Sequence, residues 1–263
     1  MDVCRLDVCR LNTCRLIVDV PAPGPWNMAV DEVLLEEATQ GTTTLRLYQW
    51  NEPTLSLGYF QPAAERAVHA ASRGCPLVRR ASGGGAIMHD RELTYCLATP
   101  IPERFGPVAQ GLFDSVHEAL IETLAGFGVR AQLVQPPRRD YTSTADRRTA
   151  PQPFLCFQRR APGDVLVATA KIAGSAQRRQ RGGLMQHGSI LLARSQRAPE
   201  LPGIEELTGA IIPPADLAHD FSQAIANRLR IQWTATVPSD ADKQRALALE
   251  RKRFAASEWT TRR

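Results

Sequence analysis

The order of strand-like and helical segments is the feature that most restricts how this chain can fold. Strand-like stretches are found at residues 45–50, 54–60, 76–80, 92–98, 164–177 and 184–193. Helices are expected at residues 26–39, 65–72, 108–126, 215–229 and 242–256. The two kinds of segment neither alternate strictly, as a doubly wound parallel sheet requires, nor fall into separate blocks. The sequence therefore predicts an α+β fold in which mixed β-sheets are flanked by helices.

Two stretches differ from the rest in composition. Residues 3–16 read VCRLD-VCRLN-TCRL, a near-repeat of five residues that matches neither the strand nor the helix period. We therefore expect residues 1–15 to be a low-complexity, disordered extension. Residues 135–153 are rich in Pro, Arg, Thr and Asp, which predicts a mobile loop. Residues 16–263 are expected to form a single domain that contains this loop.

Composition excludes several classes of protein. The chain is 43% hydrophobic and 22% charged, which is typical of a globular protein. No window approaches the roughly 18 unbroken apolar residues of a membrane helix, and Arg and Asp interrupt the N-terminus where a signal peptide would be apolar. We expect a cytoplasmic protein that does not bind membranes. The six Cys residues show no CxxC and no zinc-type spacing with His, so no metal site is expected.

The basic residues are strongly biased toward arginine. The net charge is +5, and only Lys171, Lys243 and Lys252 among the 32 basic residues are lysines. Because a lysine amine is a compact charge that can lose its proton, a lysine kept in such a chain is a candidate for chemistry, although one lysine can also stand anywhere by chance. A pI of about 9.1 raises the possibility of nucleic-acid binding. Aromatic residues are only 6% and no recognised binding motif is present, so nucleic acid is not an expected partner.

A glycine-rich segment between two strands is the first candidate site. Residues 79–90 read RRASGGGAIMHD, so three successive glycines follow two arginines and precede a histidine. Glycines let backbone N–H groups approach a ligand, and arginine adds charge for a phosphate or carbonyl oxygen. The spacing fits neither the Walker nor the dinucleotide-binding pattern. A plain turn is the alternative.

Three further stretches carry reactive or small residues. Lys171 begins KIAGSAQ, in which small side chains leave room for a ligand or for a tight sheet crossing. His187 lies inside a strand-like stretch, where a histidine is most often a hydrogen-bonded core residue. Cys156 follows the arginine-rich loop, and positive charge favours a thiolate, whereas a free Cys is more often a small buried hydrophobe.

Taken together, these stretches resemble the biotin/lipoate A/B protein ligase family. The segments that carry the resemblance occur in family order and are 27–32, 56–61, 79–95, 171–177 and 186–190. Within the family the chain is most similar to octanoyltransferases that use a cysteine nucleophile, in which a Cys-Phe pair precedes the lysine at about the interval between Cys156 and Lys171. The resemblance implies the catalytic domain shared by biotin synthetases and class II aminoacyl-tRNA synthetases. It also implies that the domain at 16–263 is catalytic.

The resemblance further implies a reaction. An octanoyl group would pass from octanoyl-acyl carrier protein to Cys156 and then to a lysine of an apo lipoyl domain or of the glycine-cleavage H protein. No cofactor is expected, because a thioester is already activated. Lys171 would stabilise the Cys156 thiolate. His89 and His187 would shape the site or form hydrogen bonds and would not act as the base, and the group that takes the proton of the acceptor lysine is left open. The substrate-binding residues implied are Arg79, Ser82, Gly83, Gly84, Gly85, His89, Gly174, Ser175, His187 and Gly188.

Several alternatives stay open at this point. The nearest is an ATP-dependent lipoate or octanoate ligase, and another is an amidotransferase that moves octanoyl from H protein to other lipoyl domains. A member that only binds lipoyl proteins is a third. Arginines near the candidate site either steer acidic carrier proteins or are simply this chain's usual surface cation. They are Arg138, Arg139, Arg147, Arg148, Arg159, Arg160, Arg178, Arg179 and Arg181.

Overall fold

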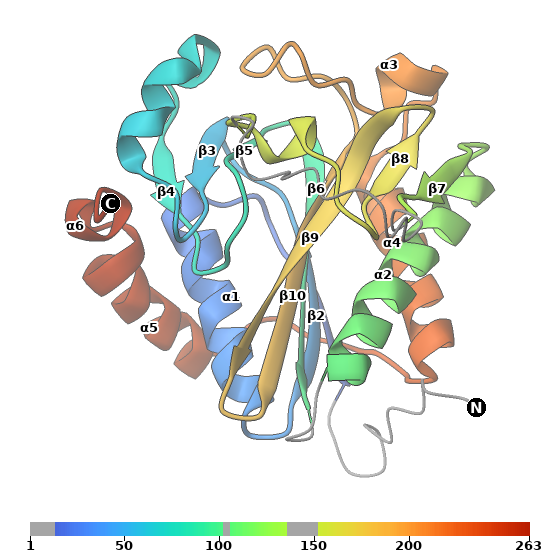
Figure 1. Ribbon diagram of the computed structural model, residues 1–263. Helices are drawn as coiled ribbons and strands as arrows, with labels where there is room; N and C mark the ends of the chain where they lie inside the picture. The colour runs from blue at the N-terminus through green and yellow to red at the C-terminus, as the bar shows by residue number, and fades with distance from the viewer. Residues whose placement is uncertain (1–13, 102–105, 136–151) are drawn as a thin grey trace, which may run out of the picture.

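The computed structural model describes residues 14–101, 106–135 and 152–263 (Figure 1). Within them, the main sheet has eight strands in the order β11-β1-β2-β6-β10-β9-β8-β7. β1 is parallel to both neighbours, and all other neighbouring strands are antiparallel, so the sheet is mixed as predicted. The bounds are β1 Cys14–Val18, β2 Thr43–Tyr48, β6 Glu92–Pro100, β7 Ala131–Leu133, β8 Val165–Val167, β9 Ala170–Gln180, β10 Gly183–Leu191 and β11 Thr234–Ala235.

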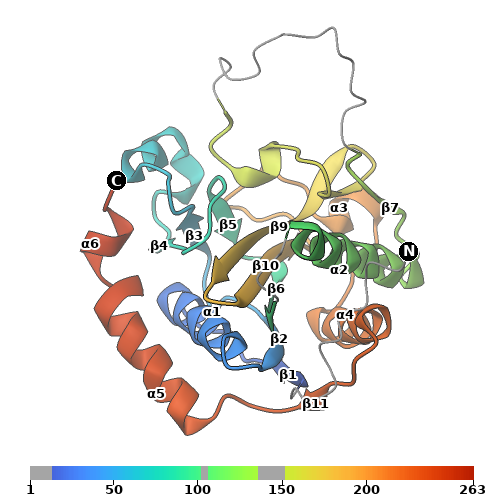
Figure 2. The ribbon, with the colours of Figure 1, turned by 60° about the horizontal axis from the view of Figure 1, so that its bottom comes forward.

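Helices cover both faces of this sheet (Figures 1 and 2). α1 packs on one face, with α5 outside it, and α2 and α4 pack on the other. The prediction of mixed sheets flanked by helices is therefore confirmed. The helices are α1 Gly24–Ala38, α2 Gly106–Gly126, α3 Ile204–Thr208, α4 Pro214–Leu229, α5 Asp240–Leu249 and α6 Ser257–Thr260, with a π-helical turn at Glu250–Phe254. In the part of the chain that the structure describes, no helix is long and apolar enough to span a membrane.

Strand β6 shows why this sheet must be covered on both sides. Leu93, Tyr95 and Leu97 belong to the core beneath α2 and α4. Cys96 and Ala98, which alternate with them, belong to the core beneath α1. Because successive side chains of a strand point to opposite faces, a strand with apolar residues at nearly every position needs a helix layer on each face.

A second sheet positions the glycine-rich segment. It has the order β4-β3-β5, with bounds β3 Thr54–Leu57, β4 Leu77–Arg79 and β5 Ile87–His89. The loop between β4 and β5 contains the three glycines and docks on the segment before the one-turn helix η3 (Cys156–Gln158). There the Cys156 amide donates to the Ala86 carbonyl over 2.7 Å, and the Ala86 amide donates to the Phe154 carbonyl over 3.0 Å.

The boundary expected at residue 15 is wrong by two residues. β1 begins at Cys14, so the last copy of the five-residue repeat enters the strand. Tertiary contact overrides the weak local pattern here, because β1 lies between β2 and β11 and buries Ile17. Residues 1–13, and residues 136–151 of the predicted loop, lie outside the described part of the chain.

Two of the strand-like stretches differ from the simplest expectation. β2 and β3, which only the short segment at residues 49–53 separates in sequence, belong to different sheets. The stretch predicted as one strand at 164–177 is divided into β8 and β9 by a turn in which Ala168 has φ +51°. Non-glycine residues rarely adopt this left-handed conformation. The turn nevertheless contains Ala168 and Thr169 and lacks the Gly or Asn that tight hairpins favour.

Candidate active site

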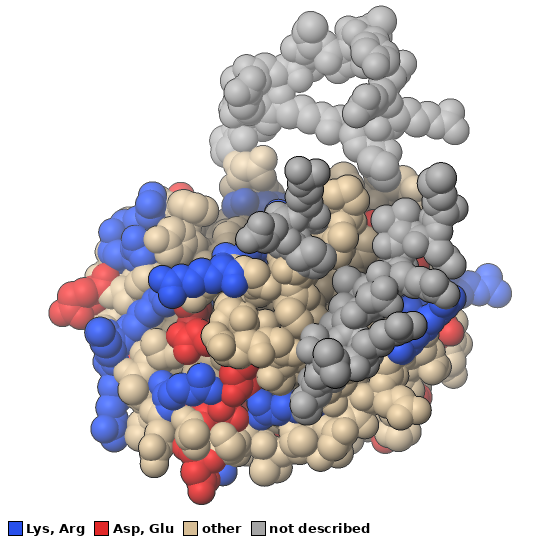
Figure 3. Space-filling model, turned by 90° about the horizontal axis from the view of Figure 1, so that it is seen from below, with Lys and Arg blue, Asp and Glu red and all other residues tan. Residues whose placement is uncertain are grey.

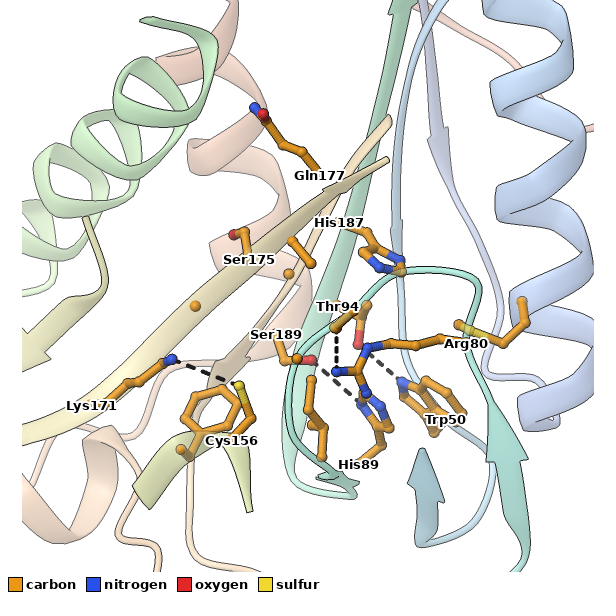
Figure 4. Close-up of a pocket in the computed structure, with 18 of the residues that line it drawn as sticks. Trp50, Arg80, His89, Thr94, Cys156, Lys171, Ser175, Gln177, His187 and Ser189 are labelled. Atoms are coloured by element: carbon orange, nitrogen blue, oxygen red, sulfur yellow. Dashed lines mark hydrogen bonds between the residues drawn. The ribbon is translucent and has the colours of Figure 1, made fainter. Parts of the chain in front are cut away.

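A cavity of about 300 Å³ opens between the small sheet and strands β9 and β10 (Figure 4). Its size lies at the lower end of the range for small-molecule sites. It is lined by Met28, Tyr48, Trp50, Arg80, Gly83, Gly84, Ile87, His89, Thr94, Cys156, Phe157, Lys171, Gly174, Ser175, Ala176, Gln177, His187, Gly188 and Ser189. Nine of the twelve residues expected from the sequence are among them.

Cys156 and Lys171 lie next to each other in the wall of this cavity (Figure 4). The Lys171 Nζ is 4.0 Å from the Cys156 Sγ and 2.8 Å from Asp164 Oδ2. The side chains of Lys171 and Asp164 are each 5% exposed, so water screens this ion pair weakly. Asp164 precedes β8, and Lys171 lies on the neighbouring strand β9. The arrangement places an ammonium group beside a half-buried thiol.

Gly174 explains how Lys171 reaches this position. A methyl group at Gly174 would lie 2.6 Å from the Lys171 Nζ and closer still to its Cε. It would also lie 3.0 Å from Asp164 Oδ1. The lysine side chain therefore lies against the backbone of β9 where residue 174 has no side chain, which is a physical reason for glycine in the KIAGSAQ stretch.

Arg80 lines the cavity, although it is not among the residues expected from the sequence. Its guanidinium is buried and donates to the carbonyls of Ser56, Gly83 and Gly85 over 2.7–3.2 Å. Burial lowers the pKa of Arg80 to about 10, and the nearby Cys156 opposes this shift. The side chain therefore remains a cation at neutral pH. Its hydrogen bonds to the Gly83 and Gly85 carbonyls hold the glycine loop in place. Gly84, with φ +98°, faces both Arg80 and Cys156.

Arg79 lies outside the cavity. Its buried guanidinium donates to carbonyls of the 58–61 loop and of the C-terminal helix α6, namely Gly58, Tyr59, Gln61, Trp259 and Thr260. Burial lowers its pKa, and the nearby Arg262 and Arg263 act in the same direction. Neighbouring residues of an extended chain point in opposite directions, which is why Arg80 lines the cavity and Arg79 does not.

His89 is fixed in the wall of the cavity. Its Nδ1 is 2.6 Å from Glu92 Oε1, and its Nε2 is 2.8 Å from Ser56 Oγ. The ring stacks on Trp50 with centroids 3.8 Å apart, and the Trp50 indole donates to Thr94 Oγ1. Both ring nitrogens and one ring face of His89 are therefore occupied.

His187 connects the cavity to helix α1. Its Nε2 is hydrogen-bonded to Ser82 Oγ, and its Nδ1 is 3.3 Å from Asp31 Oδ2. Asp31 is itself held by an ion pair with Arg46 over 3.1 Å and by the hydroxyl of Tyr48 over 2.9 Å. Ser82, which does not line the cavity itself, precedes the glycines that do. The Asn27–Glu32 motif thus contributes the carboxylate that orients His187.

Ser175 lines the cavity, but its hydroxyl bonds to groups on the α2 side of β9. Its Oγ is 2.5 Å from both Tyr95 Oη and His117 Nε2. His117 Nδ1 is 2.6 Å from the Gly163 carbonyl, and burial lowers the pKa of His117. A side chain at Gly188 would collide with this Ser175 hydroxyl, so glycine is required there for close packing of β9 on β10. Gly85, also outside the cavity, packs against Arg159.

One residue of the site carries no signal in a single sequence. Asp164 stands alone among many acidic residues, and only the packing of β8 on β9 places it beside Lys171. Asp31 lies in the 27–32 segment that carried the family resemblance, and the packing of α1 on β10 brings its carboxylate to His187. The sequence shows two adjacent arginines before the glycines, Arg79 and Arg80, but does not indicate which of them lines the cavity. Among the described residues, no group of three or more His, Cys, Asp or Glu side chains is arranged to hold a metal ion.

The arginines expected to steer partners differ in their surroundings. Arg178 forms an ion pair with Glu32, which also binds Arg253 over 3.2 Å. Arg160, Arg179 and Arg181 are exposed. On the face shown in Figure 3, basic and acidic side chains lie next to one another along one side. Arg138, Arg139, Arg147 and Arg148 lie outside the described residues.

Comparison with known proteins decides the family. Residues 23–228 match the lipoyl protein ligase A/B catalytic domain. The chain belongs to this family. An octanoyltransferase LipM from Brevibacillus brevis is 31% identical to this lipoyl ligase A/B domain, over 90% of the chain and 94% of the relative. Another, from Kyrpidia tusciae, is 40% identical over 64% of the chain and 61% of the relative.

Solved structures support the fold of this lipoyl ligase A/B domain. A putative lipoate protein ligase from Thermoplasma acidophilum superimposes with a TM-score of 0.75 and 18% identity, over 95% of this chain and all of that one. A lipoate-protein ligase A bound with ATP gives a TM-score of 0.74 at 18% identity, over 95% and 98% of the two chains. At this level of identity the likeness concerns the fold alone.

Proposed function

We propose that the protein is an octanoyltransferase that carries the octanoyl group on Cys156 as a thioester and delivers it to the lysine of a lipoyl domain. The observation that carries the proposal is the 4.0 Å contact between the Cys156 Sγ and the Lys171 Nζ inside the cavity. The names of the relatives at 31–40% identity support the acyl group and the reaction class. Eleven of the twelve residues expected from the sequence are proposed to form the site. The twelfth, Arg79, is proposed to hold the loops around it. Arg80 and Asp164 are added to the site.

Loading begins when the Cys156 thiolate attacks the thioester carbonyl of octanoyl-acyl carrier protein. The new C–S bond forms, the carbonyl is restored, and the phosphopantetheine thiolate leaves with a proton from solvent. A thiol and a thioester leaving group have similar basicity, so the exchange needs no further activation by ATP or by a metal. The ammonium of Lys171 stabilises negative charge on the sulfur and on the carbonyl oxygen.

The acceptor is a lysine of a lipoyl domain, and the H protein is a second acceptor of the same chemistry. Acyl carrier proteins and lipoyl domains are acidic, so exposed arginines beside the site, such as Arg160, would raise the rate of encounter. The cavity suits a medium-length acyl chain because its wall includes Met28, Trp50 and Phe157. Burying each methylene stabilises the bound chain by about 0.8 kcal/mol.

Intact-mass measurement tests the proposal. The wild-type protein, mixed with octanoyl-acyl carrier protein and no ATP, is expected to gain one octanoyl group. Cys156→Ser should gain none, whereas Cys75→Ser, which replaces a different, buried free cysteine, should load normally. A normal adduct on the Cys156→Ser protein would overturn the assignment of the nucleophile.

The same assay separates the alternatives. An ATP-dependent ligase would modify the lipoyl domain from free octanoate only when ATP is present, and alkylation of its thiols would leave most of that activity. An amidotransferase would accept octanoyl-H protein as the donor for loading Cys156. For the proposed activity we expect octanoyl-acyl carrier protein to load the protein without ATP. Alkylation of the protein's thiols should abolish this loading.

A further inference from the structure

The segment at residues 56–61 carries part of the family resemblance, yet none of its six residues lines the cavity. Near its end, Phe60 is 67% exposed to solvent. One exposed apolar residue by itself carries little information, because such residues are common on protein surfaces. The groups around Phe60 therefore decide what this side chain does.

Three aromatic rings and two arginines form one surface here, which we call the rim patch (Tyr59, Phe60, Trp259, Arg262 and Arg263). Tyr59 meets Phe60 edge to face, with ring centroids 4.8 Å apart. The Arg262 guanidinium lies 4.5 Å from the ring centroid of Tyr59 and 4.7 Å from that of Trp259. The Arg263 guanidinium lies 5.3 Å from the centroid of Phe60. Contacts of this kind hold a guanidinium in place and leave its N–H groups available to a partner.

Arg262 and Arg263 carry positive charge that the described part of the chain leaves unneutralised. Both are exposed, and neither side chain forms an ion pair or a hydrogen bond with any described residue. Glu65 and Glu258, on the neighbouring elements, are exposed and do not pair with them. The pKa of Arg79 is lowered by burial, and the charges of Arg262 and Arg263 lower it further. The rim patch therefore presents uncompensated cations beside exposed aromatic rings.

The rim patch adjoins the mouth of the cavity through the glycine loop. Gly83 is half-buried and Gly84 is exposed, although both line the cavity, so this part of the loop forms the rim of the mouth. A Cβ atom at Gly84 would lie 3.9 Å from the Cys156 Sγ. A Cβ atom at Gly83, the next residue, would lie 3.9 Å from the Phe60 Cδ2. The Phe60 ring therefore borders the rim close to the nucleophile.

Hydrogen bonds to the main chain fix the rim patch beside this loop. The Tyr59 amide donates to the Ser82 carbonyl over 2.8 Å, and the Trp259 indole donates to the Arg79 carbonyl over 2.8 Å. Helix α6, which contains Trp259, lies beside β4, the strand from which the glycine loop leaves (Figure 1). The rings of the patch therefore keep a fixed position relative to the mouth.

We propose that the rim patch is the surface on which the acceptor docks, an acidic lipoyl domain whose target lysine enters the mouth beside Phe60. The inference rests on the proposed function and names the binding surface for its second substrate. Carboxylates of the lipoyl domain match the charge of Arg262 and Arg263, and a planar guanidinium can hold a carboxylate with two hydrogen bonds. Phe60 supplies the apolar contact at the edge of the mouth.

The reach of the two substrates decides which of them uses this surface. A lysine side chain extends about 6 Å from its Cα, through five bonds of about 1.5 Å each, so the domain that carries it must rest on the rim itself. The acyl carrier protein presents its thioester on a much longer phosphopantetheine arm, so its body can bind further from the mouth. A charged patch directly at the rim therefore suits the acceptor.

Single-turnover discharge of the isolated octanoyl-protein, at increasing concentrations of apo lipoyl domain, tests the inference. For the double variant Arg262→Glu with Arg263→Glu we expect the half-saturating acceptor concentration to rise about tenfold or more, because charges at the edge of an interface act mainly on encounter. The rate at saturation, and loading by octanoyl-acyl carrier protein, should stay within about twofold of wild type. Arg251→Glu with Lys252→Glu makes the same change in charge at exposed positions outside the patch and is the matched control.

Two further measurements identify the contact. Phe60→Ala should also raise the half-saturating concentration, whereas Val237→Ala, at a residue that is 74% exposed, should not. A lipoyl domain whose exposed carboxylates beside the target lysine are replaced by lysines should be a poor acceptor for the wild type. The double variant should use that domain better than the wild type does, because the charges are then complementary again.

The outcomes separate this inference from the proposed function. An unchanged half-saturating concentration in the double variant and in Phe60→Ala would overturn the inference, and so would equal slowing of loading, which would place the donor on this surface. Hydroxylamine needs no docking surface and should discharge the octanoyl forms of wild type and variants at similar rates. A slower reaction of the variants with hydroxylamine would mean that the patch acts on the chemistry of the site, which would also overturn the inference. Failure of the wild-type protein to load would overturn the proposed function itself.

Discussion

The side chain of Lys171 lies against the backbone of Gly174, three residues further along the same strand, so that the ammonium reaches both Asp164 and Cys156. This contact makes the position of the charge depend on the absence of a side chain at residue 174. It also leads to the first prediction.

Gly174→Ala should keep the fold and lose activity. The new methyl group would lie 2.6 Å from the Lys171 Nζ, so the end of this flexible side chain must move, which strains its ion pair with Asp164 and costs some stability without removing either partner. Because a displacement of about 1 Å at a reacting centre can cost about 100-fold in rate, we expect loading to fall by at least tenfold. Gly74→Ala, where a methyl group would meet nothing within 4 Å, is the control. Wild-type loading by Gly174→Ala would contradict the proposed role of the lysine.

Asp164→Asn should reduce both stability and loading. The change removes the negative partner of a buried ammonium 2.8 Å away, and breaking a buried pair costs about 3–5 kcal/mol. We expect a loss near the lower end of that range, because the amide oxygen of Asn still accepts from the Ala161 amide. Urea unfolding measures the loss of stability, and the loading assay measures the loss of activity. Asp220→Asn, at an exposed position of α4, is the control. An unchanged loading rate would mean that Asp164 does not position Lys171.

The lowered pKa of His117 predicts a stability that falls in mild acid. The ordinary pKa is 6.5, and burial lowers it in the folded protein. Below pH 6.5 the unfolded chain therefore binds a proton that the folded chain does not, so stability is complete above pH 6.5 and declines toward the lower folded pKa. The slope is at most about 1.4 kcal/mol per pH unit for one proton. In urea unfolding at several pH values, His117→Gln should show a shallower slope, and an identical slope would contradict the prediction.

The start of β1 can be tested by truncation. A chain that begins at Thr13 keeps the whole strand, and it should load octanoyl and unfold at the wild-type temperature. A chain that begins at Asp19 loses buried Ile17 and the strand that joins β2 to β11, so its unfolding temperature should fall by several degrees or more. Equal stability of the two chains would mean that β1 contributes little to the fold.

The sequence predicts most of the elements because their local patterns agree with their environments. The helix at 108–126 has apolar residues three and four apart, and the structure places a helix at Gly106–Gly126 with Leu112, Val116 and Leu120 buried. The motifs that suggested chemistry also meet in one cavity, because each lies in a strand or loop beside β9 and β10.

What the sequence does not predict depends on contacts between distant segments. The positions of β2 and β3 in different sheets follow from the packing of whole strands, which the turn between them does not determine. The choice of Arg80 over Arg79 depends on which way the chain faces as it leaves β4. Asp164 reaches Lys171 only through the irregular pairing of β8 with β9, and such irregularities have no single-residue signal.

The carbonyl acceptors of Arg79 join two segments that are far apart in the sequence. The buried guanidinium ties the 58–61 loop, next to the glycine segment, to Trp259 and Thr260 of α6. Trp259 and Thr260 accept three of the six hydrogen bonds that Arg79 donates, and burying an arginine incompletely paired is costly. Detachment of α6 should therefore loosen the loop beside the glycines, so that a disturbance outside the pocket is transmitted to its wall.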